Sequence, residues 1–179
     1  MVAVIVACEI GFWVVLGAGL VARYLLRMRR LGAALLIATA LVDLVALTAA
    51  IVDLRGGATA DWSHGLAALY IGFSVAFGPI MVRWADGRFA HRFAGGPAPT
   101  KPPKYGLERA RYEWKLWFRA VLASAISGAL LFAAIRLVDD AGRTASLNDT
   151  LGVLPRVVII WGIIALSYTI FPKASKVLG

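Results

Sequence analysis

The 179-residue chain has very few of the side chains that build catalytic and metal sites. Its single cysteine, Cys8, excludes an intramolecular disulfide and a cysteine-based metal cluster. It has two histidines, His64 and His91, too few for a multi-histidine metal or haem centre. The HExxH, GxSxG, GxxxxGK[ST] and GxGxxG motifs of common enzyme classes are also missing. We therefore expect no metal and no cofactor, and a protein that is not an enzyme.

Charged residues are scarce as well, and apolar residues are in excess. Hydrophobic residues make up 60% of the chain and charged residues 16%. A soluble domain carries about 45–50% apolar and about 25% charged residues. A chain of this size cannot hide such a surplus in one core, because it must still cover itself with polar surface. The composition predicts an integral membrane protein.

The apolar residues are grouped into long runs. A hydrocarbon core about 30 Å thick needs about 20 helical residues. Five segments reach that length, at about 2–26, 31–54, 64–84, 117–138 and 151–171. In the first segment the positive cluster follows the apolar run, so we expect an uncleaved anchor and not a signal peptide. The predicted fold class is all-α, a polytopic transmembrane helical bundle of five helices forming one membrane domain over residues 1–179.

Basic residues are distributed very unevenly between the predicted connections. Fifteen Lys and Arg fall in the first and third connections and the C-terminal tail, against three in the second and fourth connections. Cytoplasmic segments accumulate Lys and Arg, so this pattern places the N-terminus outside and the C-terminus in the cytoplasm. The same rule explains the net charge of +9 without nucleic acid, which we do not expect as a partner.

A few ionisable residues fall within or at the mouth of the apolar segments, where charge is costly. They are Glu9, Asp43, His64 and Arg156, and each falls in the outer half of the predicted bilayer or near its middle. We expect these four to converge on an outward-facing polar pocket. The alternatives are a buried ion pair that fixes helix packing, or a carboxyl that burial keeps neutral. The sequence leaves open which acid would pair with Arg156.

The connection over residues 85–116 is basic and rich in proline. It begins with interleaved aromatic and basic residues over 87–93, continues through a glycine- and proline-rich stretch over 95–103, and ends in good helix formers over 107–119. We expect an extended middle and an interfacial helix that turns into the fourth span. The candidate contacts for lipid headgroups or a partner are Arg88, Arg92, Arg109, Arg111 and Lys115.

Three local signals concern the shape of the helices. The Gly78-Pro79 pair should loosen or kink the third span. Asp61 or Ser63 can cap the start of that span, and Asn148 or Thr150 can cap the start of the fifth. Small residues at helix-packing spacing, among them Gly17 and the pair Gly72 and Ala76, suit close contact between helices.

Three stretches are similar to a known family. Residues 64–73 (HGLAALYIGF), 84–90 (WADGRFA) and 112–115 (YEWK) resemble the YmcC-type small bacterial membrane proteins, from about the second to the fourth span. The resemblance implies a bacterial cytoplasmic membrane location. It implies no catalytic residues, because no activity is assigned to that family.

Three classes of function fit this pattern, in decreasing order of expectation. The first is a non-enzymatic accessory protein that binds a partner or organises lipid, with its ionisable residues sealed in ion pairs. The second is a small homo-oligomeric transporter or channel, with Asp43 and Glu9 facing a wet cavity. The third is an intramembrane enzyme. Membrane lipids are expected contacts in all three, and a second copy or another membrane protein is a possible partner.

Overall fold

The described part of the chain folds into five long helices. The computed structural model describes residues 2–93 and 95–172, and the side chains at positions 2–6, 8, 9 and 93 lie outside that description. The helices are α1 (Val2–Leu20), which continues into a short π-helix, η1 (Val21–Leu25), then α2 (Arg29–Arg55), α3 (Trp62–Phe93), α4 (Gly106–Val138) and α5 (Ala145–Ile170). No strand occurs in these two ranges. The predicted all-helical fold is confirmed.

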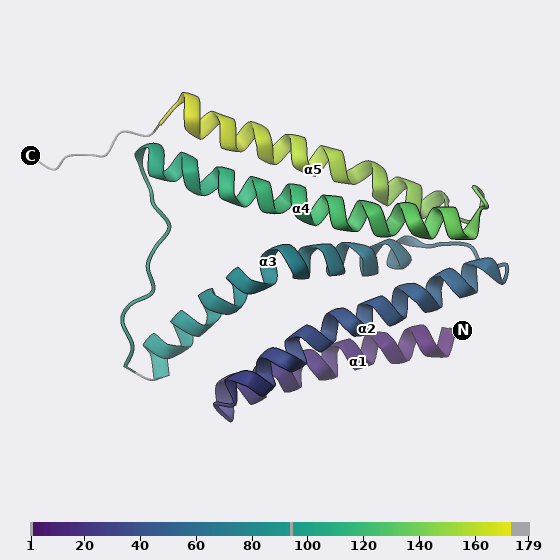
Figure 1. Cartoon of the computed structure of the whole chain (residues 1–179), viewed down its shortest axis with the longest axis horizontal. Helices are drawn as coiled ribbons and strands as arrows, with labels where there is room; N and C mark the ends of the chain where they lie inside the picture. The colour runs from purple at the N-terminus through teal and green to yellow at the C-terminus, as the bar shows by residue number, and fades with distance from the viewer. Residues whose placement is uncertain (1, 94, 173–179) are drawn as a thin grey trace, which may run out of the picture.

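Successive helices run in opposite directions and pack side by side (Figure 1). α1 lies on α2, α2 on α3, α3 on α4 and α4 on α5, with smaller contacts between α3 and α5 and between α2 and α4. The start of α1 and the α2–α3 and α4–α5 turns share one end of the molecule (Figure 1). The two basic connections share the other end, which we term the basic end.

Four helices, α2 to α5, are long and apolar enough to cross a membrane. In the first helical segment the corresponding apolar stretch, counted over the described residues, is shorter and runs over Ile10–Leu25. Most large apolar side chains outside the helix contacts are exposed, for example Ile37 on α2 and Ile163 on α5. Such a surface is suited to the hydrocarbon layer of a membrane, where apolar side chains can face lipid and polar groups must be satisfied inside the protein.

Three helix ends differ from the expected positions. α3 continues to Phe93, past the expected end at residue 84. α4 continues without a break from Gly106 to Val138, so residues 107–119 do not form a separate interfacial helix. α5 begins at Ala145, which places Asn148 and Thr150 inside the helix. Both side chains donate to backbone carbonyls four residues earlier, at 3.1 and 2.9 Å, and do not cap the helix. Hydropathy marks where a helix enters the apolar layer, and a helix with polar first turns begins earlier.

The proline of α3 coincides with a change in helix direction. Pro79 lies inside the helix, and α3 bends part-way along its length (Figure 1). Proline cannot donate to the carbonyl four residues earlier, and its ring pushes that carbonyl away. Arg119 of α4 supports this region, since its Nη1 donates to the Ala76 carbonyl of α3 at 3.2 Å. The predicted kink therefore has a cross-helix partner.

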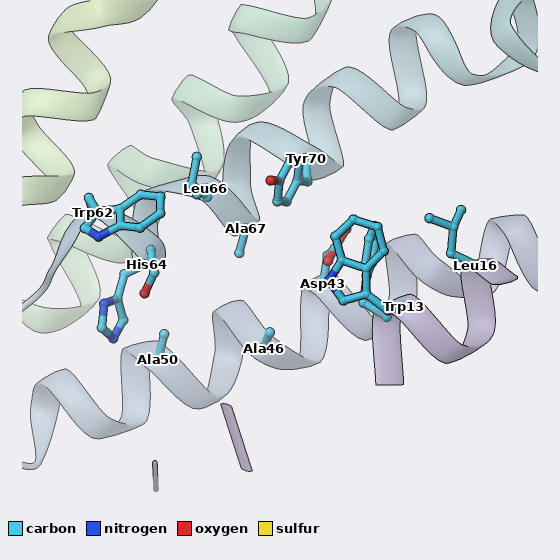
Figure 2. A pocket seen from close by; sticks show the side chains of 12 residues that line it. Trp13, Leu16, Asp43, Ala46, Ala50, Trp62, His64, Leu66, Ala67 and Tyr70 are labelled. Carbon is cyan, nitrogen blue, oxygen red and sulfur yellow. The ribbon is translucent and has the colours of Figure 1, made fainter. Parts of the chain in front are cut away.

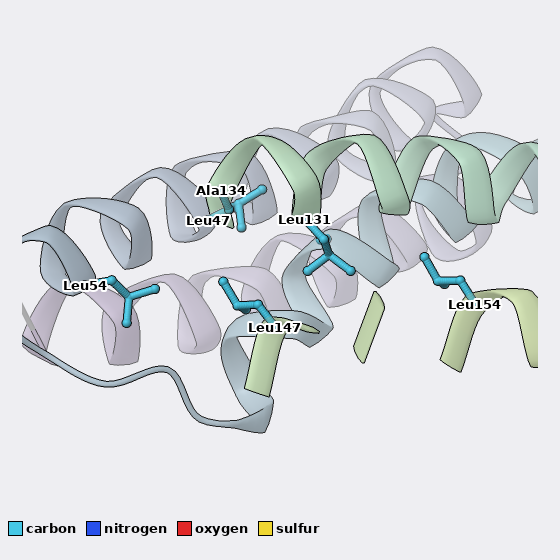
Figure 3. Close-up of a cluster of buried hydrophobic side chains, with 7 residues drawn as sticks. Leu47, Leu54, Leu131, Ala134, Leu147 and Leu154 are labelled. Atoms are coloured by element: carbon cyan, nitrogen blue, oxygen red, sulfur yellow. The ribbon is translucent and has the colours of Figure 1, made fainter. Parts of the chain in front are cut away.

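The apolar core lies at the end opposite the basic end (Figure 3). Leu54 at the end of α2, Leu131 of α4 and Leu147 of α5 are buried there, beside Leu47, Leu154, Ala68 and Ala134. Farther along, α3 and α4 approach so closely at Gly72 that a Cβ there would meet the Ser127 hydroxyl and the Ala123 carbonyl. These contacts fix α3 between α2 and α4, and so position its first two turns beside α1 and α2.

Candidate functional site

A cavity lies between α1, α2 and α3, near the end that carries the apolar core (Figure 2). Its volume is about 500 Å³, within the range of about 300–1,000 Å³ that small-molecule sites occupy. Most of its wall is apolar, and four aromatic residues contribute to it: Phe12 and Trp13 of α1, and Trp62 and Tyr70 of α3. The polar side chains in the wall are Asp43, Ser63 and His64.

Asp43 comes from the middle of α2 and is only 6% exposed. Its Oδ2 has no hydrogen-bond partner among the described residues. No Lys or Arg lines the cavity, and Asp43 is in none of the ion pairs found in the described part of the chain. A buried carboxylate without a partner costs free energy, because it has lost water and gained nothing in exchange. The fold therefore keeps an unpaired acidic group at the cavity wall.

Asp61 organises the start of α3 beside the cavity. Its Oδ1 accepts hydrogen bonds from the Ser63 backbone N–H at 2.9 Å and from the Ser63 hydroxyl at 2.6 Å. Asp61 directly precedes the helix, so it takes the capping role predicted for it. The Ser63 hydroxyl and, after it, the His64 ring hold the Asp61 pKa down at about 2. Asp61 is therefore anionic across the physiological range.

The same carboxylate fixes which nitrogen of His64 carries a proton. His64 Nδ1 lies 2.7 Å from Asp61 Oδ1. The Asp61 backbone N–H also lies 3.2 Å from Nδ1. The contact with the carboxylate is much shorter, and two acceptors cannot approach to 2.7 Å without a hydrogen between them, so we assign the proton to Nδ1. The other ring nitrogen, Nε2, is buried and has no hydrogen-bond partner among the described residues. In the neutral ring Nε2 is a lone-pair acceptor, and it belongs to a side chain that lines the cavity.

Aromatic contacts join α1 to α3 across the cavity. Phe12 and Tyr70 stack with centroids 6.1 Å apart and planes 15° apart. Phe12 also meets the Trp13 ring edge-on, at 5.5 Å. These rings give the cavity flat, electron-rich walls.

A curated relative covers almost the whole chain. The "Uncharacterized membrane protein YmcC" of Bacillus subtilis (strain 168) is 41% identical over 173 residues, which are 96% of this chain and 92% of the relative. This chain belongs to the YmcC family. The resemblance is confirmed, and it extends beyond the second to fourth spans. No protein-family model matches the chain, and no solved structure matches it.

The family and the helices together make this a multi-pass integral membrane protein. The relative's printed name gives no ligand, partner or activity. The chemistry of the site is therefore inferred from the residues of this YmcC-family chain.

The structure brings some of the predicted pocket residues together and not others. Asp43 and His64 line the same cavity. The Glu9 side chain lies outside the described residues. Arg156 is exposed on α5 and does not line the cavity. α5 packs mainly against α4 and α3, whereas Asp43 is on α2, and no ion pair of the described residues contains Arg156, so Arg156 is not placed as the counter-charge of Asp43.

The aromatic wall was missed by reasoning from the sequence. Trp13 and Trp62 are 69% and 71% exposed, and they were indistinguishable from ordinary membrane-interface aromatics. Phe12 and Trp13 are adjacent in the sequence and about 100° apart around the helix, which does not show which helix faces either of them. Their position opposite Tyr70 emerges only when α1, α2 and α3 are packed together.

The predicted basic contacts fall into two groups in this YmcC-family protein. Arg88, Arg92, Arg111 and Lys115 are exposed at the basic end, and Arg88 lies 4.7 Å from the Trp84 ring centroid. Arg109 differs, because it pairs with the buried Glu113 and its guanidinium lies 5.0 Å from the Tyr168 ring of α5. Arg109 thus connects α4 to α5 inside the bundle, while the other four face outward.

Proposed function

We propose that this YmcC-family protein is a non-enzymatic binding protein of the membrane, and that its cavity between α1, α2 and α3 holds a small amphipathic molecule. The observation that carries the proposal is the buried Oδ2 of Asp43, which has no hydrogen-bond partner among the described residues and lies in the wall of a cavity of about 500 Å³. A purely structural acid would be paired, since an unpaired one lowers stability. A ligand group that pairs with Asp43 offsets this cost.

The proposal includes a location and an orientation. We place the protein in the bacterial cytoplasmic membrane, with the start of α1 outside and the basic end in the cytoplasm. The alternating helices support this orientation, because they gather thirteen Lys and Arg of the described residues at one end. The cavity then lies in the outer half of the bilayer. The exposed cations Arg88, Arg92, Arg111 and Lys115 contact anionic headgroups or a partner membrane protein.

A small transporter, acting as a homo-oligomer, is the second candidate. Asp43 lines a cavity and is in no ion pair of the described residues, which is the arrangement expected for this class and departs from the sealed ion pairs expected for an accessory protein. The bend of α3 at Pro79 favours the transporter, because α3 contributes half of the cavity-lining residues and a bent helix can open or close a site. Loading of a fluorescent or radiolabelled ligand into sealed liposomes distinguishes transport from binding. Net flux that depends on Asp43 supports the transporter, and saturable binding without flux supports the binding protein.

The experiment for the proposed function compares the full-length protein with Asp43→Asn and with Asp53→Asn. The second variant makes the same chemical change on α2 at a residue outside the cavity wall. Native mass spectrometry of each purified protein should show small molecules bound to the wild type and to Asp53→Asn, and fewer bound to Asp43→Asn. The thermal stability of ligand-free Asp43→Asn should equal or exceed that of the wild type. Clear destabilisation with no change in bound molecules would overturn the proposal.

A further inference from the structure

The two unpartnered polar atoms of the cavity have the same hydrogen-bonding character. Asp43 Oδ2 is an acceptor when the carboxyl is ionised. His64 Nε2 is an acceptor because Nδ1 carries the proton toward Asp61. A ligand that satisfies both must supply donors. No lining residue supplies a cation, so an anionic ligand would meet a carboxylate with nothing to offset the repulsion.

The apolar part of the wall also favours positive charge. Trp13, Trp62 and Tyr70 present aromatic surface to the cavity. The faces of such rings attract cations, most strongly where water is excluded. An acid and several rings at one site are therefore complementary to an organic ammonium group. The remaining wall residues, such as Leu16 and Ala67, accommodate hydrocarbon.

The two acceptors lie at different ends of the cavity. Figure 2 shows the His64 ring near Ala50 and the Asp43 side chain near Trp13. Asp43 and Ala50 are seven residues apart on α2, which corresponds to roughly 10 Å along the helix axis. A single ammonium group cannot reach both acceptors. The ligand must be elongated to use the whole site.

We infer that the ligand is an elongated organic amine: its ammonium group pairs with Asp43, its apolar body lies against the aromatic wall, and a hydroxyl or amide donor at the far end reaches His64 Nε2. This inference rests on the proposed function and specifies its ligand class. It separates the site from one for phospholipids or fatty acids, whose headgroups are anionic or carry a phosphate.

The test uses probes that share a carbon skeleton and differ in the head group. They are 4-phenylbutylamine, 4-phenylbutanol and 4-phenylbutyrate, with 4-(4-hydroxyphenyl)butylamine to add a far donor. Binding to the full-length protein in detergent is measured by tryptophan fluorescence and thermal shift. The wild type should bind the amine at least about tenfold more tightly than the alcohol, and the butyrate most weakly. The hydroxylated amine should bind more tightly than the plain amine.

Variants test which side chain causes the preference for the amine and which causes the preference for the hydroxylated amine. Asp43→Asn should reduce the ratio of amine to alcohol affinity to about one, and Asp53→Asn should leave it unchanged. His64→Phe should remove the advantage of the hydroxylated amine alone. Equal wild-type affinities for amine and alcohol would overturn the ligand class, and this comparison needs no variant to fold.

A cavity-filling variant distinguishes failure of the ligand class from failure of the proposed function. Ala46 lines the cavity, and Ala46→Phe would occupy it. If amine and alcohol bind equally and Ala46→Phe blocks both, the cavity is a binding site for another class of ligand. If Ala46→Phe changes the binding of no probe, both the ligand class and the proposed function fail.

Discussion

At the scale of single residues, Asp61 connects the start of α3 to the candidate site. Its carboxylate caps the helix through Ser63 and orients the His64 ring through Nδ1. Loss of this carboxylate therefore has two effects. The first turn of α3 loses its cap, and His64 loses the contact that leaves Nε2 as an acceptor toward the cavity.

We predict that Asp61→Ala destabilises the protein in a pH-dependent manner. The hydrogen bonds lower the Asp61 pKa from 3.8 to about 2, so they stabilise the folded state above the ordinary pKa. This stabilisation is lost as the pH falls from about 4 towards 2. Thermal melts should show a loss of about 0.5–2 kcal/mol at pH 6, typical of a lost N-cap, and a smaller difference near pH 3. Asp149→Ala, an exposed change on α5, should cost less than about 0.5 kcal/mol. A pH-independent loss would contradict the prediction.

Two polar residues of the candidate site could be picked out from the sequence, but the side chains around them could not. Asp43 and His64 could be singled out because an ionisable residue in or beside an apolar segment is costly at any position along it. Arg156 met the same criterion, yet it lies on the outer face of α5. The free-energy cost of an ionisable side chain depends on its depth in the bilayer, which its position along an apolar run indicates. The direction in which the side chain points depends on how the helix is rotated, and packing against the other helices sets that rotation.

At the scale of helices, the contact between α3 and α4 depends on the absence of a side chain at Gly72. Its missing Cβ leaves room for the Ser127 hydroxyl and the Ala123 carbonyl. Small residues allow such close approach between membrane helices. The Ala123 carbonyl is part of the backbone and cannot rotate away as a flexible side chain can. A larger residue at position 72 therefore has no room.

We predict that Gly72→Ala and Gly17→Ala have opposite outcomes. Gly72→Ala should destabilise by about 1–3 kcal/mol, because the added methyl overpacks the α3–α4 contact. A Cβ on Gly17 meets nothing within 4 Å, so Gly17→Ala should be neutral or stabilise by up to about 1 kcal/mol through helix propensity. Chemical denaturation in detergent measures both. Equal effects of the two variants would show that Gly72 is not a packing constraint.

The helices themselves were largely predictable, and their ends were not. Five long apolar runs and the four polar or glycine-rich connections between them predict five helices that alternate in direction. The extra turns of α3 beyond Trp84 and of α5 before Leu151 lie in polar sequence, where hydropathy gives no signal. Helix propensity and i to i−4 hydrogen bonds by Asn148 and Thr150 continue the helix there. The α3 kink was predictable because proline removes a hydrogen bond regardless of context.

At the scale of the whole molecule, the end of the first helical segment is fixed to α3 by a polar pair and a ring pair. Arg23 of η1 pairs with Asp86 of α3, and its Nε donates to Asp86 Oδ1 at 2.8 Å. Beside it, the Tyr24 and Phe89 rings lie 4.9 Å apart. Together with the Phe12–Tyr70 stack, these contacts hold the first helical segment to α3 at two separate levels along its length. The cavity between them depends on both.

We predict a measurable coupling between Arg23 and Asp86. Arg23→Gln and Asp86→Asn should each destabilise the protein, and the double variant should lose less than the sum of the two. The expected coupling is about 1 kcal/mol, since the pair is partly buried and joins two elements. Arg27→Gln with Asp86→Asn provides the control cycle, because Arg27 is exposed in the connection between η1 and α2 and is in no ion pair found among the described residues. Additive losses in the Arg23 cycle would show that the pair is incidental.

The extended linker over residues 95–104 has a consequence for assembly. α3 and α4 are held together by their own packing, including Gly72 with Ser127 and Arg119 with the Ala76 carbonyl, so the peptide bond between their ends adds little to recognition. The gene can then be divided within the linker, between Pro99 and Thr100. Two co-expressed fragments, 1–99 and 100–179, should find each other in the membrane and purify as a one-to-one complex through a tag on either one. Fragment complementation of this kind would make the linker a natural insertion point for a reporter domain at the basic end.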